Sequence, residues 1–340
     1  YTYREIEKDG FRIDYKNDME LVSDTSYAIC KSMGKELAGF ADIFEEADLD
    51  MLVLLGDRFE IQMAAVAAML YRIPVAHIHG GELTQGLMDD AIRHSVTKMS
   101  DLHFTSTSEY AQRVIQMGEQ PERVFCVGAL GIENIKSIRL LSREQLCQKF
   151  GDIFLHNYIM VTYHPVTLEK HTAGIQFQKL LNVVENHPEY HYIFTYANAD
   201  TDGAIINKMI ESYTQEHKNT KAFVSMGQLG YLSALQYCSA VLGNSSSGII
   251  EAPSFHIPTI NIGDRQKGRV RAKTVIDCGY ETRDIEQALT ESQNQKFKDL
   301  CQESTNPYEG KNTSEQIIMQ IKKYLNQVQG KQKIFYDIEV

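Results

Sequence analysis

The sequence contains few prolines and no long apolar run. Of its 340 residues only 7 are Pro and 22 are Gly, whereas 43% are hydrophobic and 23% are charged. This balance argues against an intrinsically disordered chain and against collagen-like repeats. No apolar stretch approaches the roughly 18 residues that a bilayer-spanning helix needs, so we expect neither a signal peptide nor a membrane partner. A chain of this length is expected to form about two domains.

The spacing of the cysteines and the shortage of positive charge argue against two further classes, disulfide-bonded proteins and nucleic-acid-binding proteins. The six cysteines form no CxxC pair, and in a chain of this size they are typical of reduced thiols in a cytoplasmic protein. The 34 Lys and Arg residues are outnumbered by 45 Asp and Glu, which gives a net charge of −11. This charge disfavours a nucleic-acid partner. A small anionic ligand remains compatible with it, because such a ligand responds to the charge of its own pocket.

Short apolar runs alternate with helix-like stretches along the first half of the chain. Predicted strands cover residues 50–55, 74–78, 102–105 and 123–127. Predicted helices cover residues 61–69, 89–98 and 108–117. Continuous apolar strands that alternate with helices favour a parallel sheet covered on both faces.

The pattern restarts after a predicted helix at residues 143–151. Further strands are predicted at 158–162, 192–195, 221–224, 240–242 and 259–262, and further helices at 173–186, 203–216, 228–238, 246–254 and 313–328. We therefore predict an α/β protein with two Rossmann-like, doubly wound domains that face a cleft. The expected boundaries are 1–155 for the first domain and 156–312 for the second, with 313–340 forming a helix that packs back toward the first.

A serine-rich turn follows one of the second-half strands. Residues 243–248 read Gly-Asn-Ser-Ser-Ser-Gly and lead into the helix predicted at 246–254. Serine hydroxyls and backbone N–H groups at a helix start suit a diphosphate, so Ser245 and Ser246 are candidate ligands. A simple helix cap explains the same residues equally well. Glu251, one turn further on, is a candidate for binding ribose hydroxyls, although an isolated Glu there is more often solvated surface.

Other polar residues of the second half follow strand ends. Arg265 follows the strand at 259–262, and its forked guanidinium suits bidentate contact with a phosphate. His164 and Asn198 each follow a strand, at the sheet edge where open α/β sheets bind ligands, although either could be a turn residue. Three more basic residues follow Arg265, namely Lys267, Arg269 and Arg271. A solvated loop explains these three as well as a role in ligand binding does.

Acids and imidazoles follow the strands of the first half. They are Asp57 and Arg58 after the first strand, His79 and Glu82 after the second, and Asp89 and Asp90 at the start of the next helix. Crowded carboxylates push their pKa values apart, which can supply one acid and one base at neutral pH. Asp89 and Asp90 are also explained as charges that favour a helix start.

The pair His77 and His79, with acids nearby, also permits a metal-binding interpretation. Residues two apart share one face only while a strand stays regular. The sequence offers no further dense set of His and Asp to complete such a site. We therefore expect no metal.

Together these motifs resemble the hydrolysing sugar-nucleotide 2-epimerases, which act on UDP-N-acetylglucosamine. The resemblance covers nearly the whole chain. It rests on residues 56–59, 77–82, 89–94, 164–167, 243–248 and the loop around Arg265. It implies the two-domain GT-B architecture, a cytoplasmic homodimer or homotetramer, a nucleotide-sugar substrate and no cofactor.

The resemblance also implies a reaction and a set of roles. A base removes the C2 proton while UDP leaves, and water then adds to the 2-acetamidoglucal to give N-acetylmannosamine. Ser245, Ser246, Arg265 and His164 would hold the diphosphate, Glu251 the ribose and Arg58 the sugar or phosphate. The acid and base would be Asp57, Asp89 and Asp90.

Two departures from the family pattern qualify this expectation. Many relatives carry a catalytic Glu where this chain has His79. A histidine could still carry the proton, Glu82 could replace it, or the change could mark a branch that acts on a diacetamido-trideoxyhexose nucleotide. The chain also begins with Tyr1 and aligns after the first strand of its relatives, so we expect the natural protein to have additional N-terminal strands.

Three other functions remain as alternatives. Non-hydrolysing epimerases carry Ala-Gly-Leu-Arg where this chain has Gly-Gly-Glu at 80–82. A GT-B glycosyltransferase would share the serine-rich turn, but it would not require the acids at 57, 89 and 90. A non-catalytic nucleotide-sugar-binding protein would bind the same ligand without turnover.

Overall fold

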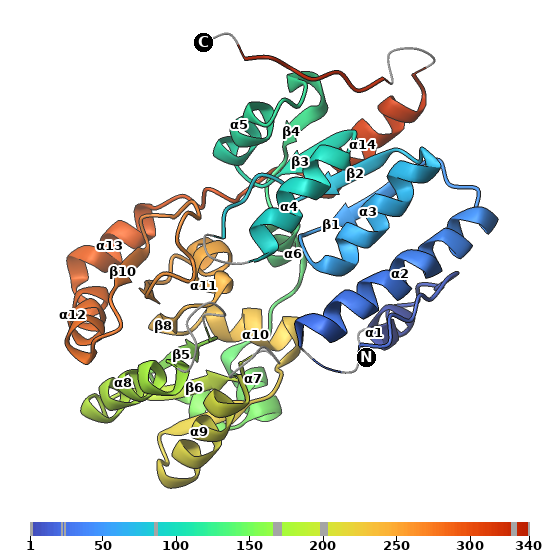
Figure 1. Ribbon diagram of the computed structural model, residues 1–340. Coiled ribbons are helices and arrows are strands. Elements are labelled where there is room, and N and C mark those ends of the chain that lie inside the picture. The colour runs from blue at the N-terminus through green and yellow to red at the C-terminus, as the bar shows by residue number, and fades with distance from the viewer. Residues whose placement is uncertain are drawn as a thin grey trace.

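Two parallel sheets, each flanked by helices, form the protein (Figure 1). The structure is a computed structural model, and it describes residues 3–21, 23, 25–84, 88–165, 172–197, 203–327 and 332–338. No helix in these ranges is both long enough and apolar enough to span a bilayer.

The first sheet has four strands in the order β1-β2-β3-β4, all parallel. They are β1 (Leu52–Leu55), β2 (Val75–Ile78), β3 (Leu102–Thr105) and β4 (Val124–Cys126). The helices of this half are α1 (Tyr3–Lys8), α2 (Ser26–Glu46), α3 (Phe59–Tyr71), α4 (Met88–Met99), α5 (Ser108–Gln116) and α6 (Leu130–Ser137), with a 3-10 turn at Pro121–Arg123. Because neighbouring strands are parallel, their carboxyl ends meet at one edge of the sheet.

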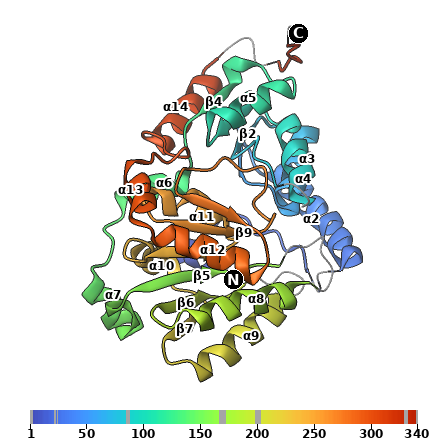
Figure 2. The same cartoon turned by 90° about the vertical axis from the view of Figure 1, so that its left-hand side faces the viewer.

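Helices from both ends of the chain cover the first sheet. On one face, α2, α3 and α4 pack on β1 and β2 through a core that includes Phe44, Phe59 and Val96. On the other face, α14 (Thr313–Leu325) places Ile317 and Tyr324 against β2, β3 and the chain that follows β4. This last helix therefore lies with the first half of the protein although it follows the second half in sequence (Figures 1 and 2).

The second sheet has the doubly wound strand order β10-β9-β8-β5-β6-β7. Its strands are β5 (Tyr158–Thr162), β6 (His191–Thr195), β7 (Thr220–Phe223), β8 (Ala240–Gly243), β9 (Thr259–Ile262) and β10 (Val275–Cys278). Its helices are α7 (Arg143–Phe150), α8 (Ala173–Asn186), α9 (Gly203–Glu216), α10 (Gly227–Leu235), α11 (Ser246–Ile250), α12 (Thr282–Gln293) and α13 (Gln295–Glu303), with 3-10 turns at Asp152–Leu155 and Ala252–Phe255. The chain winds outward from β5 in both directions, so β5 and β8 flank the point where ligands bind in such sheets.

The predicted α/β class is confirmed, and most element predictions are correct within a few residues. The helix predicted at 246–254 is wrong in its second half. There the chain leaves α11 at Glu251 and forms the 3-10 turn Ala252–Phe255, because Pro253 has no N–H to continue the helix. Strand β10 was not predicted, since its four residues are partly exposed and include Asp277. The long helix α2 was also missed, although its apolar residues recur at helical spacing. Four shorter helices were missed as well, namely α1, α6, α12 and α13.

Candidate active site

The carboxyl ends of β1 and β2 bring the acids and imidazoles of the first half together. The two strands pair with Leu54 opposite His77, so the turns that carry Asp57 and His79 leave the sheet side by side. His79 itself adopts a left-handed conformation with φ 68°, which turns the chain sharply at the strand end. Gly81 follows with φ 78°, and a Cβ there would collide with the carbonyl of Tyr110. A glycine at this position therefore permits the tight turn that delivers Glu82.

Arg93 of α4 is the centre of this group of side chains. Its guanidinium is almost completely buried, with 1% of the side chain exposed. Nε and Nη2 both donate to Asp57 Oδ2, Nε at 3.0 Å, and Nη1 donates to Asp90 Oδ1 at 2.9 Å. The same Nη1 also donates to the backbone oxygen of Glu82 at 2.8 Å, and Nη2 donates to Thr84 Oγ1. One buried cation thus contacts two carboxylates of the predicted acid/base set.

Glu82 is buried and lies between an imidazole and an arginine. His79 Nδ1 lies 3.0 Å from its Oε1, and Ser106 Oγ donates to the same oxygen at 3.1 Å. Arg269 Nη1, from the second half of the chain, donates to Oε2 at 2.7 Å. Burial alone would raise the pKa of Glu82, but the hydrogen bond from His79 and the charges of Arg269 and Arg93 outweigh it and lower the pKa to about 2. Glu82 is therefore an ionised carboxylate throughout the physiological pH range.

The two other predicted residues of the first half are Asp89 and Arg58. Asp89 lies in the first turn of α4 and is half-buried. Arg58 is exposed just before α3 and pairs with Glu60 of that helix at 3.3 Å. His94, which was not predicted, lies with Nε2 3.8 Å from Asp90 Oδ2; its pKa is lowered mainly by burial.

His77 supports the fold and is unavailable to a metal. Its Nε2 lies 2.8 Å from the carbonyl oxygen of Gly56, and its Nδ1 lies 3.3 Å from Thr97 Oγ1. Burial lowers its pKa to about 3, so the ring is neutral and both nitrogens are occupied. Within the described ranges, no three His, Cys, Asp or Glu side chains gather in a way that could hold a metal ion.

In the second half, the serine-rich turn leaves the end of β8. Gly243 has φ 141°, and a Cβ there would collide with the carbonyl of Thr162 on the neighbouring strand. Ser245 caps α11 by accepting a hydrogen bond from the Ser247 N–H at 3.4 Å, and Ser246 begins the helix. The helix-cap interpretation of the turn is therefore correct for Ser245. A cap of this kind still leaves hydroxyl groups at the sheet edge.

Asn244 joins the serine-rich turn to His164 and to the loop after β9. Its side chain accepts from the His164 N–H at 2.7 Å and donates to the His164 carbonyl at 2.8 Å. Its own carbonyl accepts from Arg265 Nη1 at 3.2 Å and from Gln266 Nε2 at 2.9 Å. Burial and the charge of Arg265 lower the pKa of His164 to about 4, so this imidazole is neutral. The predicted residues Ser245, Ser246, His164 and Arg265 thus lie around one point.

Glu251 lies one turn further along, at the boundary with the first half. It accepts a hydrogen bond from Ser247 Oγ, which in turn accepts from the Tyr231 hydroxyl at 2.9 Å. A Cβ on Gly131 of α6 would lie 3.8 Å from Glu251 Oε1. Burial raises the pKa of Glu251. The predicted ribose ligand is therefore not solvated surface, but part of the contact between the two halves.

The loop of residues 263–274, which we call the arginine loop, connects the two groups. Arg265 reaches Asn244, and Arg269 on the same loop pairs with Glu82 of the first half. Two further basic residues of the loop have partners elsewhere: Lys267 is exposed and lies 3.6 Å from Asp264, and Arg271 pairs with Asp277.

Arg93 and Arg269 were not predicted as site residues, and Asn198 lies outside the described residues. Arg93 could have been found from its spacing, because Asp90 and Arg93 are three residues apart and share one helix face. Nothing in the basic run distinguishes Arg269 from its neighbours.

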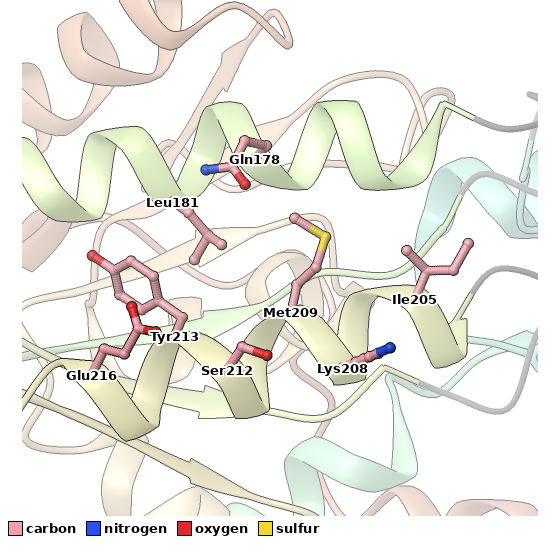
Figure 3. Close-up of a pocket in the computed structure, with 8 residues that line it drawn as sticks. All are labelled: Gln178, Leu181, Ile205, Lys208, Met209, Ser212, Tyr213 and Glu216. Carbon is pink, nitrogen blue, oxygen red and sulfur yellow. The ribbon is translucent and has the colours of Figure 1, made fainter.

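A shallow pocket elsewhere in the second half is unrelated to these residues. Its volume is about 510 Å³, and it lies between α8 and α9 (Figure 3). Leu181 and Met209 point toward each other across it, and Lys208 and Glu216 lie at its edge. It contains none of the predicted site residues, so it is not the candidate active site.

Comparison with known proteins identifies the family. The model of the UDP-N-acetylglucosamine 2-epimerase family matches residues 1–322. The chain belongs to this family. It is 41% identical to the Polysialic acid biosynthesis protein P7 of Escherichia coli, over 99% of this chain and 86% of that protein. It is also 41% identical to the GDP/UDP-N,N'-diacetylbacillosamine 2-epimerase (hydrolyzing) of Campylobacter jejuni, over 87% of this chain and 77% of that protein.

Solved structures of the epimerase family share the fold. The UDP-GlcNAc 2-epimerase from Neisseria meningitidis bound to UDP-GlcNAc superimposes with a TM-score of 0.78 over 94% of this chain and 87% of that chain, at 20% identity. This likeness confirms the predicted GT-B-like architecture of two α/β domains. The chain is thus an epimerase by family.

Proposed function

We propose that this protein is a hydrolysing 2-epimerase that converts UDP-N-acetylglucosamine to N-acetylmannosamine and UDP. The observation that carries the proposal is the pairing of Glu82 with Arg269. It joins the acids and imidazole of the first half to the loop that also carries Arg265, the proposed phosphate ligand. A sugar nucleotide would contact both groups at once, because C2 of its sugar is next to C1, which carries the diphosphate. The sugar would face the acids and imidazole, and the diphosphate would face Arg265.

The diphosphate would lie against the second half. Ser245 and Ser246 offer hydroxyl groups at the strand end, and Arg265 offers a forked cation. Neutral His164 can donate a hydrogen bond to a phosphate oxygen without adding a second positive charge beside Arg265. The negative charge on UDP grows as the C1–O bond breaks, so these donors stabilise the transition state more than the bound substrate. Glu251 would accept hydrogen bonds from the ribose, and Asn198 would contact the same substrate.

The sugar would lie against the first half, where the proton transfers occur. A base takes the C2 proton, the C2 electron pair forms the C1–C2 double bond, and the C1–O electrons leave with UDP. Water then adds its oxygen to C1, and an acid returns a proton to C2 on the opposite face. We assign these transfers to Asp57, His79, Asp89 and Asp90. Glu82 is held ionised and therefore supports His79, and Arg58 would orient the substrate from the rim.

A second substrate has specific support. Two relatives, at 41% and 36% identity, are diacetylbacillosamine 2-epimerases (hydrolyzing). The same elimination and hydration would convert a UDP- or GDP-linked 2,4-diacetamido-trideoxyhexose, because both sugars carry the acetamido group at C2. The residues that set C4 and C6 specificity decide between the two substrates.

A proton NMR time course in deuterated water tests the proposal. The protein is incubated with UDP-N-acetylglucosamine and, in parallel, with the UDP-linked diacetamido sugar, with Asp57→Asn as the matched control. We expect free UDP and a 2-epimerised free sugar that carries deuterium at C2. A product that keeps its UDP would instead show a non-hydrolysing epimerase. Binding of both nucleotides without any turnover would contradict the proposed enzyme and favour a binding protein.

A further inference from the structure

Arg269 is the residue through which the second half touches the acid/base group of the first half. Its Nη1 donates to Glu82 Oε2 at 2.7 Å, and only 11% of the Arg269 side chain is exposed. The two residues are 187 positions apart in the sequence. The contact therefore depends on how the arginine loop docks against the first half.

Two tyrosines fix that docking at the adjacent residue. The Val270 N–H donates to the Tyr110 hydroxyl at 2.9 Å, and the Tyr308 hydroxyl donates to the Val270 carbonyl at 2.9 Å. The two hydroxyl groups also lie 2.9 Å apart, and both rings are buried. Tyr110 belongs to α5 of the first half, so the backbone beside Arg269 is held from both sides. The guanidinium consequently reaches Glu82 from a fixed direction.

Glu82 in turn determines the state of His79. An ionised carboxylate can only accept a hydrogen bond, so the His79 nitrogen that lies 3.0 Å from Glu82 Oε1 must carry a proton. In the neutral ring this leaves Nε2 as the unprotonated nitrogen, and 20% of the His79 side chain is exposed. The Ser106 hydroxyl, 3.1 Å from the same Oε1, prevents the carboxylate from rotating away. His79 is thereby oriented as a base.

We propose that Arg269 is a positioning residue which, through Glu82, holds His79 in the tautomer that makes Nε2 a base for the sugar. The inference rests on the proposed function for the identity of the substrate, but the state of His79 is a property of the free protein. The arrangement is complete only when the arginine loop is docked on the first half. Arg265 lies on the same loop. Binding of a nucleotide at Arg265 is thus linked to the orientation of His79.

The test is an NMR measurement of the histidine tautomers in the full-length protein labelled with ¹⁵N-histidine, with the His79 signals assigned from His79→Gln. In the wild type we expect the neutral His79 ring to be protonated at Nδ1. Arg269→Met frees the Glu82 carboxylate to move, and Glu82→Gln replaces a group that only accepts by one that also donates, so both variants should populate both tautomers. Arg269→Lys, which keeps an N–H donor for Glu82, should retain more of the wild-type tautomer than Arg269→Met does. Lys267→Met removes a positive charge from the same loop, where Lys267 pairs with Asp264, so it should leave the tautomer unchanged.

Steady-state kinetics give a second readout in the active enzyme. The kcat of Arg269→Met should fall about tenfold or more with little change in KM, because the orientation of the base is lost while the substrate contacts remain. A tautomer that is unchanged in Arg269→Met would overturn the proposal. So would a wild-type His79 protonated at Nε2. Absence of turnover with either sugar would count against the proposed function alone, because the tautomer measurement needs no substrate.

Discussion

Arg93 binds Asp57 through two of its nitrogens and so ties the middle of α4 to the end of β1. The guanidinium is buried, whereas 27% of the Asp57 side chain is exposed. The cation therefore lies beneath the acid, and the acid is partly exposed to solvent. The same cation holds Asp90, so the spacing of the two carboxylates depends on one side chain.

Loss of Arg93 should damage both stability and activity. Arg93→Met leaves Asp57 and Asp90 without their cation, and breaking such buried pairs costs about 3–5 kcal/mol of unfolding free energy. Denaturant unfolding measures this loss. Arg58→Met is the matched stability control, because the exposed Arg58–Glu60 pair contributes at most about 0.5 kcal/mol. If Arg93→Met and Arg58→Met lowered the unfolding free energy equally, the stabilising role of Arg93 would be contradicted.

Asp57 should matter for turnover much more than for binding. Asp57→Asn keeps the shape of the side chain and a hydrogen bond to Arg93, but it removes the group that can take or return a proton. We expect turnover to fall about a hundredfold or more, the usual range for a positioned acid or base, with UDP affinity largely retained. Release of UDP and calorimetric binding measure the two effects. Near-normal turnover would remove Asp57 from the mechanism.

The sequence was sufficient for every strand except β10, because the central strands, such as β2, β3 and β5, are buried along their whole length and are mostly apolar. The β3 and β5 ranges match the structure to the residue. Strand ends also located Asp57, His79 and His164, since polar residues after a buried strand in a parallel sheet converge on one edge.

The contacts that turn these residues into a site were not predictable from spacing. Arg93 meets Asp57 across 36 positions, and Arg269 meets Glu82 across 187. Both contacts are set by how α4 and the arginine loop pack, which depends on many core side chains at once. A long basic side chain in the sequence does not reveal whether it will be buried against an acid or remain in water, as Lys267 does.

Arg265 should act on nucleotide binding. Its guanidinium is anchored on the Asn244 carbonyl, close enough to His164 to lower the pKa of that imidazole. Arg265→Ala removes a charge-assisted contact to phosphate worth about 1.5–3 kcal/mol, so UDP should bind about tenfold to a hundredfold more weakly. Lys267→Met, on the same loop, should bind UDP as the wild type does. Unchanged affinity in Arg265→Ala, measured by calorimetry with UDP, would move the phosphate site elsewhere.

A second buried carboxylate, Glu119, holds the C-terminal segment against the first half. Its oxygens lie 2.8 Å from His103 Nε2, 2.7 Å from Lys333 Nζ and 2.5 Å from Lys98 Nζ. Lys333 Nζ also donates to the carbonyls of Lys98 and Ser100 at 2.8 Å, where α4 ends. Burial would raise the pKa of Glu119, but His103 and the two lysines lower it to about 2.

Lys333→Met should therefore destabilise the protein in a pH-dependent way. Losing the contact with the buried Glu119 carboxylate and the two hydrogen bonds to backbone carbonyls should cost about 1–3 kcal/mol at pH 7. Because the pKa of Glu119 is lowered on folding, its contribution is present above the ordinary value of about 4.5 and is lost as the pH falls toward 2. The difference in unfolding free energy between wild type and Lys333→Met should narrow over that range. Lys311→Met, before α14 and without a contact to Glu119, is the control. A difference that stays constant from pH 7 to pH 3 would show that Lys333 stabilises the fold through its packing and not through Glu119.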